Sequence, residues 1–266
     1  MPSDVPTPKS YAALVAEHGP DAFFELANLS EFTYDGLVFE QDRTLANSCA
    51  GIIWEAALFA AEHFTRTKTF ARWGARSRKV LELGCGVGVL GALAARAGAA
   101  TVMTDVAGVA FGACARNVER NKDAFGDRTP VVMALDWEDV DALKLVAATG
   151  PFDVVLGTDV VFSVKLVGAL LTCVATTLKK SKSSASYICI QRRSLEAHAE
   201  FVRMANDMFD VVVVQVLDFA EDDAVEMFEL RWRESDCEVK KRRRPKSTRA
   251  SAKRKTTEKT KKNRVI

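Results

Sequence analysis

The chain has 266 residues, 48% of them hydrophobic, which is enough to bury one large α/β core and excludes a wholly disordered protein. The net charge of +2 hides an uneven distribution. The end of the chain, from residue 238 onward, has 14 Lys+Arg and 2 Asp+Glu, whereas the remainder has 23 basic and 33 acidic residues. No apolar run is long enough to cross a membrane, no signal-peptide pattern opens the chain, and the six cysteines and three histidines lack metal-ligand spacing. We therefore expect no metal, no membrane contact, and buried free thiols in the cytoplasm, the nucleus or both.

We expect the first 47 residues to form an N-terminal extension that precedes the main domain. Residues 10–28 have helical periodicity. Asp35-Gly36 between apolar arms predicts a β-hairpin over Glu31–Gln41. A hairpin ahead of the core either covers the mouth of a pocket or closes a sheet edge.

A helix is predicted from Ser48, a suitable N-cap, to about Phe64. Trp54 falls early in this helix, where it either lies against a ligand or packs in the core. Residues 65–78 are basic and irregular and predict a linker.

Residues 79–91 have the pattern of a buried strand, a glycine loop and the start of a helix. Gly84, Gly86 and Gly88 follow the strand at alternate positions. Glycine lets the backbone turn tightly and approach a ligand, and the following helix points its first N–H groups at that ligand.

A second strand, Thr101–Val106, carries Asp105, which can accept hydrogen bonds from both ribose hydroxyls of an adenosine ligand. Residues 86–91 also fit the dinucleotide pattern G-x-G-x-x-G. S-adenosylmethionine is nevertheless favoured over NAD, because Glu82 in the preceding strand suits an amino-acid ammonium group and no basic residue near the loop could meet a pyrophosphate. The strand pattern at the end of the chain favours it too.

A helix over Gly108–Phe125 precedes a third strand, Val131–Leu135. The helix carries two polar residues that we expect at the surface, Asn117 and Asn121. Asp136 and Trp137 follow the strand, where an adenine ring would be hydrogen-bonded and stacked. Alternatively, Trp137 covers the edge of the sheet.

The fourth strand, Phe152–Leu156, leads into the segment Gly157–Phe162. Ligands in open α/β sheets bind outside the carboxyl ends of the strands, so Asp159 and Phe162 are predicted to lie beside the reacting group. A helix, a strand and a second helix follow over residues 163–180, 186–192 and 194–209.

Two β-rich runs, Asp210–Leu217 and Val225–Trp232, are joined by the acidic loop Asp218–Asp223 and should pair as an antiparallel hairpin. Five β/α units closed by such a hairpin predict a Rossmann-like, doubly wound α/β fold with a seven-stranded sheet over residues 48–236. Residues 237–266 have few apolar side chains and are predicted to form a disordered basic tail. The basic run at 240–246 is typical of nuclear import, contact with nucleic acid or loose electrostatic binding.

With these elements in place, the chain resembles the seven-strand (class I) S-adenosylmethionine-dependent protein methyltransferases of methyltransferase family 16. The resemblance covers about residues 30–235 and rests on three segments: Gly51–Trp54, Glu82–Gly86 and Leu156–Phe162. This family includes protein-lysine methyltransferases that act on chaperones, AAA ATPases and translation elongation factors. The resemblance thus implies S-adenosylmethionine as cofactor and a protein of one of these classes as substrate.

By this similarity, seven residues would contact the cofactor: Trp54, Gly84, Cys85, Gly86, Asp105, Trp137 and Thr158. Glu82 and Asp136 join them from the strand patterns above. Asp159 would hold the acceptor amine by a charge-assisted hydrogen bond, and Phe162 would wall the channel and favour the neutral amine. Many relatives carry Tyr where Phe162 stands, so any role of that hydroxyl is absent here.

The favoured reading is a monomeric protein-lysine N-methyltransferase. A protein-histidine or small-molecule methyltransferase and a catalytically idle adaptor acting through the basic tail remain open. An NAD-dependent oxidoreductase lacks a catalytic Tyr-Lys or His candidate. Methylation of DNA amino groups is disfavoured, because Val160 and Val161 stand where that chemistry uses prolines.

Overall fold

The computed structural model describes residues 16, 19, 26–44, 50–220 and 223–237. Most of the predicted helix over 10–28, the predicted cap Ser48 and the basic tail from residue 238 lie outside the described residues. Within the described ranges, no helix combines the length and apolarity needed to cross a membrane, and no group of three or more His, Cys, Asp or Glu could hold a metal ion. Four cysteines there are buried free thiols: Cys85, Cys114, Cys173 and Cys189.

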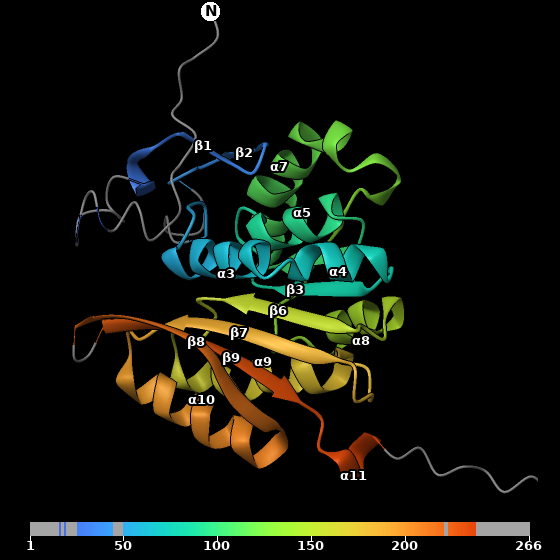
Figure 1. Cartoon of the computed structure of the whole chain (residues 1–266), viewed down its shortest axis with the longest axis vertical. Helices are drawn as coiled ribbons and strands as arrows, with labels where there is room; N and C mark the ends of the chain where they lie inside the picture. Colours follow the sequence, from blue (N-terminus) through green and yellow to red (C-terminus); the bar gives the residue numbers. More distant parts are fainter. Residues whose placement is uncertain (1–15, 17–18, 20–25, 45–49, 221–222, 238–266) are drawn as a thin grey trace, which may run out of the picture.

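The centre of the molecule is a seven-stranded mixed sheet (Figure 1). Its strands are β3 (Lys79–Leu83), β4 (Ala100–Asp105), β5 (Val131–Ala134), β6 (Val154–Thr158), β7 (Ala185–Gln191), β8 (Asp210–Ala220) and β9 (Asp223–Arg231). The spatial order is β5-β4-β3-β6-β7-β9-β8. The first five of these are parallel, whereas β9 is antiparallel to both β7 and β8. This topology confirms the predicted Rossmann-like sheet and its C-terminal hairpin.

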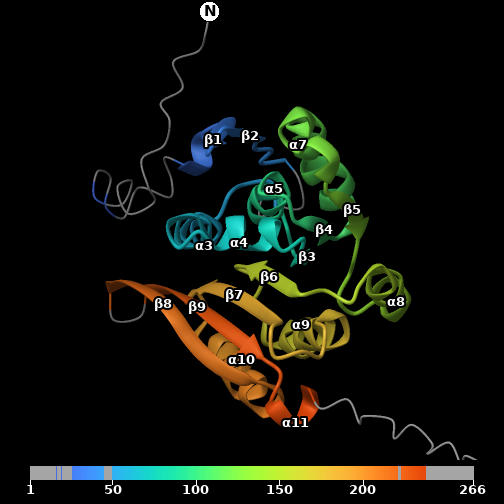
Figure 2. The same ribbon diagram turned by 45° about the vertical axis from the view of Figure 1, so that its right-hand side comes forward.

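Helices cover both faces of the sheet, with a hydrophobic core on each side (Figure 2). One face packs against α3 (Glu55–Arg66), α4 (Thr69–Ala75), α5 (Val89–Arg96) and α7 (Ala115–Arg120). The other packs against α8 (Val140–Thr149), α9 (Val164–Thr177) and α10 (Leu195–Met208). Shorter helices are α6 (Ala107–Val109) and α11 (Glu234–Cys237). Burial on both faces explains why β3 and β6 have apolar residues without alternation.

The structure corrects the prediction for the segment before the first core strand. The helix predicted from Ser48 begins only at Glu55, because residues 51–53 are held in a turn: Asp42 N donates to Gly51 O at 2.7 Å, and Ile53 N donates to the Gln41 side chain at 2.7 Å. The predicted linker 65–78 contains helix α4 instead.

Helix α4 forms there because its apolar residues have partners. Phe70 and Trp73 are buried, and both rings pack on Phe64 of α3, with Trp73 also against Tyr187 of β7. The basic residues around them had concealed this short amphipathic pattern.

Two further elements differ from the prediction. Helix α8 was not predicted, although the Asp139 side chain caps its first N–H groups by accepting from Asp141 N and Ala142 N. The single helix predicted over 108–125 is broken by a π-helical turn at Ala110–Cys114 and ends in two 3₁₀ turns.

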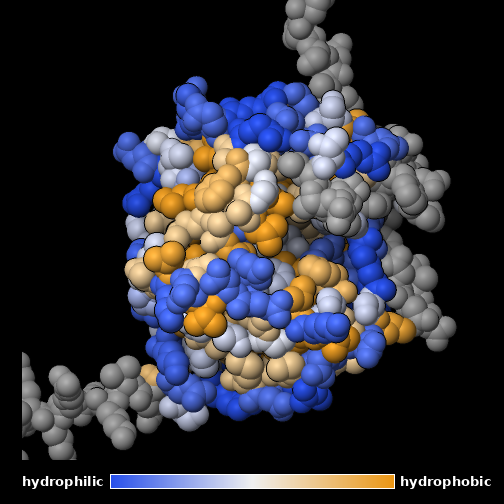
Figure 3. All heavy atoms as spheres, turned by 180° about the vertical axis from the view of Figure 1, so that it is seen from behind, coloured by the Kyte–Doolittle hydropathy of each residue, from blue (hydrophilic) through white to orange (hydrophobic). Residues whose placement is uncertain are grey.

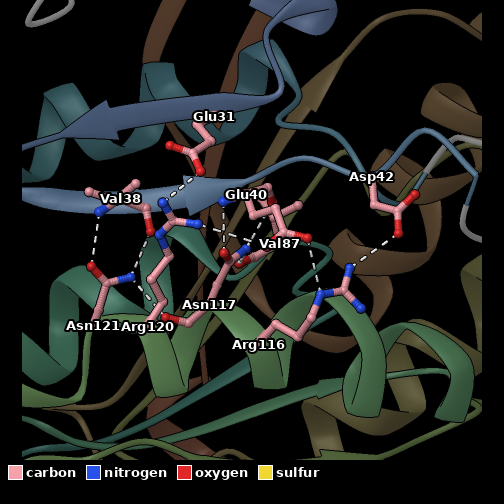
Figure 4. A network of polar contacts seen from close by, with 9 residues as sticks. All are labelled: Glu31, Val38, Glu40, Asp42, Val87, Arg116, Asn117, Arg120 and Asn121. Atoms are coloured by element: carbon pink, nitrogen blue, oxygen red, sulfur yellow. Dashed lines mark hydrogen bonds and ion pairs between the residues drawn. The ribbon is translucent and has the colours of Figure 1, made fainter. Parts of the chain in front are cut away.

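The predicted hairpin is confirmed as strands β1 (Glu31–Tyr34) and β2 (Leu37–Glu40), which form a separate two-stranded sheet beside α7 (Figure 4). The prediction that Asn117 and Asn121 lie at the surface is wrong, since they are only 3% and 7% exposed. Asn121 accepts from Val38 N at 2.9 Å and donates to Val38 O at 2.7 Å, while Asn117 accepts from Glu40 N at 2.7 Å and donates to Glu40 O at 3.1 Å.

The two side-chain amides thus pair with the free edge of β2 as a third strand would. The match is geometric, because a four-residue step along a helix and a two-residue step along a strand both span about 6–7 Å. Arg116 and Arg120 add ion pairs with acidic residues in and beside the hairpin (Figure 4). The edge of β2 is therefore satisfied by α7 rather than left open for another chain.

Asn117→Ala is expected to lower the free energy of unfolding by about 2–4 kcal/mol, because it removes three hydrogen bonds and leaves buried backbone groups of Glu40 and Val87 without partners. Urea denaturation of the variant and the wild type measures the difference. Asn206→Ala is the matched control, since Asn206 makes one exposed hydrogen bond within α10. Equal stabilities of the two variants would mean that the hydrogen bonds of Asn117 to Glu40 and Val87 contribute little to the stability of the fold.

Candidate active site

A cavity of about 640 Å³ lies at the carboxyl ends of β3, β4, β5, β6 and β7. This is the point where the chain reverses its winding direction between β3 and β6, the usual ligand site of an open α/β sheet. Nine of the eleven predicted site residues line it: Trp54, Gly84, Gly86, Asp105, Asp136, Trp137, Thr158, Asp159 and Phe162. Residues at the ends of β3, β4, β5 and β6 are thereby brought together with Trp54, which precedes α3.

The glycine loop after β3 forms the floor of the cavity, and glycine is required there for two reasons. Gly84 and Gly88 have φ values of +63° and +91°, which side chains disfavour. A Cβ atom on Gly84 would also lie 2.8 Å from Val160 and 3.3 Å from the Trp137 ring, and one on Gly88 would lie 2.4 Å from Met103. The loop therefore combines a tight turn with close packing under helix α5.

Asp105, at the end of β4, fixes the shape of this loop. Its Oδ2 accepts a hydrogen bond from Gly86 N at 2.8 Å, and its Oδ1 accepts one from Val106 N at 2.8 Å. Burial raises the pKa of the Asp105 carboxyl, while these two amides oppose the shift. Each carboxylate oxygen keeps a further acceptor site, so Asp105 can hold the loop and hydroxyl groups of a ligand together.

The other two predicted residues, Glu82 and Cys85, do not line the cavity. The Glu82 carboxylate is 2% exposed and accepts a hydrogen bond from Gly91 N of α5 at 2.8 Å. This placement differs from the expected one beside a ligand ammonium group, because the carboxyl points under the helix. The Cys85 thiol is buried beside Cys114, and that contact together with burial raises the pKa of Cys85. Both side chains support the loop from below.

Glu82 should make folding stability depend on pH. Burial raises the pKa of Glu82 from 4.5 to about 8, only partly opposed by the Gly91 amide. Between these values the folded protein binds a proton that the unfolded chain has lost, so stability falls as pH rises through this window. Glu82→Gln, which stays neutral, is expected to be more stable than the wild type by about 2–4 kcal/mol above pH 8, with little difference near pH 4.5.

Urea denaturation across this pH range measures the effect of Glu82→Gln. Exposed Glu119→Gln serves as the control and should follow the wild type. A constant difference between Glu82→Gln and the wild type at all pH values would contradict the account.

Two aromatic rings form a wall of the cavity beside the glycine loop. Trp137, the third residue after β5, packs against Phe162 with ring centroids 6.4 Å apart and planes at 41°. Asp136 turns the chain by accepting from Glu138 N at 3.0 Å. Phe162 is 60% exposed at the rim of the cavity. These rings therefore offer an apolar surface for a flat ligand in the cavity.

Asp159 is a carboxylate of this cavity whose backbone conformation and side-chain position are both fixed. Its φ of +52° is unusual for a residue other than glycine, as is often found at functional sites. The side chain is 9% exposed, and Oδ1 accepts a hydrogen bond from Gln191 N at 2.9 Å. Burial raises the pKa of Asp159 to about 6, with opposing contributions from Arg193 and the Gln191 amide. The group thus ionises near neutral pH.

Sequence reasoning missed three residues around Asp159: Glu55, Gln191 and Arg193. Gln191, the last residue of β7, and Arg193, just beyond it, line the cavity, and the same rule that selected Asp159 could have selected them. The Arg193 guanidinium stacks on Trp54, 4.4 Å from the ring centroid, and lies 3.7 Å from Glu55 and 3.6 Å from Asp159. No signal in the sequence links Arg193 to Trp54, because 138 intervening residues separate them.

Comparison with known proteins agrees with this architecture. The sequence profile of the lysine methyltransferase family matches residues 32–208. The chain belongs to this lysine methyltransferase family. The matched residues include nearly all of the N-terminal hairpin and all the residues that line the cavity. The two C-terminal strands, β8 and β9, lie outside the match.

Individual relatives match only part of this chain. EEF1A lysine methyltransferase 3 from Xenopus tropicalis is 33% identical over 113 residues, covering 42% of this chain and 46% of the relative. Protein-lysine methyltransferase METTL21E from Bos taurus is 26% identical over 167 residues, covering 62% and 56%. The chain thus spans about half the length of the curated relatives it matches.

Among solved structures, magnesium protoporphyrin IX methyltransferase from Synechocystis PCC 6803 with bound SAM aligns at a TM-score of 0.47 and 16% identity, over 65% of this chain and 81% of that one. Likeness at this distance carries no conclusion about ligand or substrate.

The charge of the cavity selects among the ligands considered for the glycine loop. Four lining residues are acidic: Asp105, Asp136, Glu138 and Asp159. Among the described residues, Arg193 is the one basic residue of the lining, and it already faces Glu55 and Asp159. Such a cavity disfavours the pyrophosphate of a dinucleotide and fits a ligand that carries positive charge. The residues present therefore fit S-adenosylmethionine, a sulfonium with an adenosine group and an amino-acid end.

Proposed function

We propose that this protein transfers a methyl group from S-adenosylmethionine to a lysine side chain of a protein substrate. The observation that carries the proposal is the Asp159 carboxylate, which has a positive φ and a side chain only 9% exposed, in the same acidic cavity as the glycine loop and Asp105. A cationic donor and a cationic acceptor both suit that cavity. Membership of the lysine methyltransferase family supports the choice of acceptor.

The cofactor would be held by side chains whose chemistry matches its parts. Asp105 would accept from the ribose hydroxyls, and Asp136 from the adenine amino group, with Trp137 against the ring. Gly84 and Gly86 would allow close approach of the backbone, while Trp54 and Thr158 complete the walls. When bound, S-adenosylmethionine supplies an electrophilic methyl group on its sulfonium.

Asp159 would hold the acceptor by accepting a hydrogen bond from the lysine ammonium group. That ammonium must lose a proton to water before its lone pair can react. The exposed Phe162 ring at the rim would restrict water around the amine and so favour the neutral form. Asp159 then orients the amine, which is the principal contribution a protein can make to such a displacement.

We propose a translation factor as substrate, because EEF1A stands in the name of the Xenopus tropicalis relative. Chaperones and AAA ATPases are the other substrate classes that the family resemblance implies. The excess of acidic over basic residues before residue 238 favours a basic target surface. Hydrophobic residues also gather across the middle of the face seen from behind (Figure 3), a composition suited to contact with another protein.

We further propose that residues 48–236 form the catalytic domain of a monomeric enzyme in the cytoplasm, the nucleus or both. The extension 1–47 would belong to the same unit, because its hairpin is fastened to α7 by Asn117 and Asn121. The tail 237–266, with its basic run, would bind an import receptor or nucleic acid.

The test uses purified protein with methyl-labelled S-adenosylmethionine and an extract of cells that lack the protein. Label in an acid-insoluble protein band supports the proposal. Label only in the acid-soluble fraction would replace it with a small-molecule methyltransferase. Cofactor binding without any transfer would replace it with the idle adaptor, which should then lose its partner when residues 238–266 are deleted.

A further inference from the structure

Arg193 occupies the centre of a small subsite beside Asp159. Its guanidinium stacks on Trp54, and its Nη2 atom lies 3.7 Å from Glu55 Oε2 and 3.6 Å from Asp159 Oδ2. The two carboxylate side chains are only 10% and 9% exposed, whereas the Arg193 side chain is 38% exposed. Two buried anions and an aromatic face thus surround one cation that reaches in from the solvent side.

Arg193 Nη2 donates a hydrogen bond to the Gln191 side chain, but this cation leaves one oxygen of Asp159 unsatisfied. Both ion-pair distances exceed a hydrogen-bond length, and Asp159 Oδ2 is buried without a hydrogen-bond partner. The other oxygen, Oδ1, is fixed by the Gln191 amide, so the carboxylate cannot turn to improve the contact. An unsatisfied buried carboxylate oxygen is costly and attracts a better donor.

An alkylammonium group is such a donor. It is compact, carries three N–H groups and can approach carboxylates from directions that the planar guanidinium fork cannot. Its unbranched methylene chain can lie on an aromatic face as the Arg193 stem does. Lysine therefore matches the subsite better than its present occupant.

We propose that Arg193 is an internal stand-in for the acceptor, a latch that fills the lysine subsite formed by Trp54, Glu55 and Asp159 until a substrate ammonium displaces it. This inference rests on the proposed function, because it identifies the subsite with the lysine of that reaction. Arg193 lies between β7 and α10, outside both elements. Its displacement breaks the hydrogen bond that Nη2 donates to the Gln191 side chain and moves the partly exposed guanidinium toward solvent. An ion pair with a partly exposed member is weak, so the latch lowers acceptor affinity by roughly tenfold at most.

The latch also sets specificity. A neutral side chain cannot replace the positive charge that leaves with Arg193, so the buried carboxylates of Glu55 and Asp159 would lose this cation without compensation. Only a cation that is narrow enough to lie along Trp54 can compensate for the loss of the Arg193 charge. The subsite thus admits an unbranched primary ammonium and excludes uncharged groups of the same length.

A binding experiment tests the latch without any methyl transfer. The probe is n-butylammonium chloride, the cation of a lysine side chain, with n-butanol as the neutral probe of equal length, both titrated by ligand-observed NMR. Arg193→Leu and Arg193→Gln are each expected to bind butylammonium at least about threefold more tightly than the wild type. Arg193→Lys puts an ammonium group, the better-fitting cation, in the subsite, so it should bind butylammonium no more tightly than the wild type. Arg203→Leu on the exposed face of α10 should resemble the wild type.

Two controls make the result specific. Butanol should bind no variant more tightly, and adding Asp159→Asn to Arg193→Leu should abolish the gain. Thermal melting identifies any variant that fails to fold, in which case the more conservative Arg193→Gln decides.

Weaker or unchanged butylammonium binding in the folded neutral variants would overturn the latch, since Arg193 would then build the subsite or play no part in it. The two proposals fail separately. Tighter butylammonium binding in Arg193→Leu without protein methylation by the wild type would leave the latch and remove the reaction. Protein methylation with no gain in binding would do the opposite.

Discussion

Asp159→Asn is expected to lower the rate of methyl transfer by at least about 100-fold while leaving the affinity for S-adenosylmethionine within a few-fold of the wild type. Asn preserves the volume of the side chain but removes the charge that holds the acceptor ammonium. The cofactor should be unaffected, because the Asp105 and Trp137 contacts are made by other strands. Single-turnover kinetics and equilibrium binding measure the two quantities.

Glu138→Gln is the matched control for the Asp159 substitution. Glu138 is an exposed carboxylate on the rim of the same cavity, so its removal changes the net charge equally without touching the acceptor position. It should retain activity within a few-fold. Full activity in Asp159→Asn would remove this carboxylate from the mechanism.

Asp105→Ala is expected to weaken cofactor binding by about 1.5–3 kcal/mol, through the loss of charged hydrogen bonds to the ribose hydroxyls and of the two bonds to Gly86 N and Val106 N. Isothermal titration with S-adenosylmethionine measures the affinity. Asp105→Asn separates the two contributions, since one amide oxygen can still accept from Gly86 N but carries no charge.

Asp127→Ala, an exposed acidic residue in a 3₁₀ turn, controls for the general loss of negative charge. Unchanged affinity in Asp105→Ala would show that the ribose assignment is wrong. An equal loss in Asp127→Ala would mean that only the overall field of the protein was altered.

The sheet was predictable from the sequence because its signals are local. A parallel strand is a short apolar run, and the glycine loop after β3 and the acids ending β4 and β6 occur where such runs stop. The carboxyl ends of parallel strands meet at one edge, so naming the strands was enough to bring Asp105 and Asp159 into one cavity. Nine of eleven predicted residues reach it for this reason.

What escaped prediction depends on contacts between distant segments. The burial of Asn117 and Asn121 follows from the free edge of β2, about 80 residues away in the chain, which no helical periodicity reveals. The start of α3 at Glu55 is set by the Gln41 side chain, and the direction of Glu82 by the packing of α5 on β3. In each case a polar side chain satisfies backbone groups of another element, and composition alone gives no partner.

The central claim is that Asp159 presents a protein lysine to the donor methyl group. The most direct measurement is mass spectrometry of the protein band labelled in the extract by the wild type, beside the same reaction with Asp159→Asn. The account predicts whole methyl increments on a lysine ε-amine, present with the wild type and absent with the variant. Methyl groups on histidine, or equal methylation by both proteins, would contradict it.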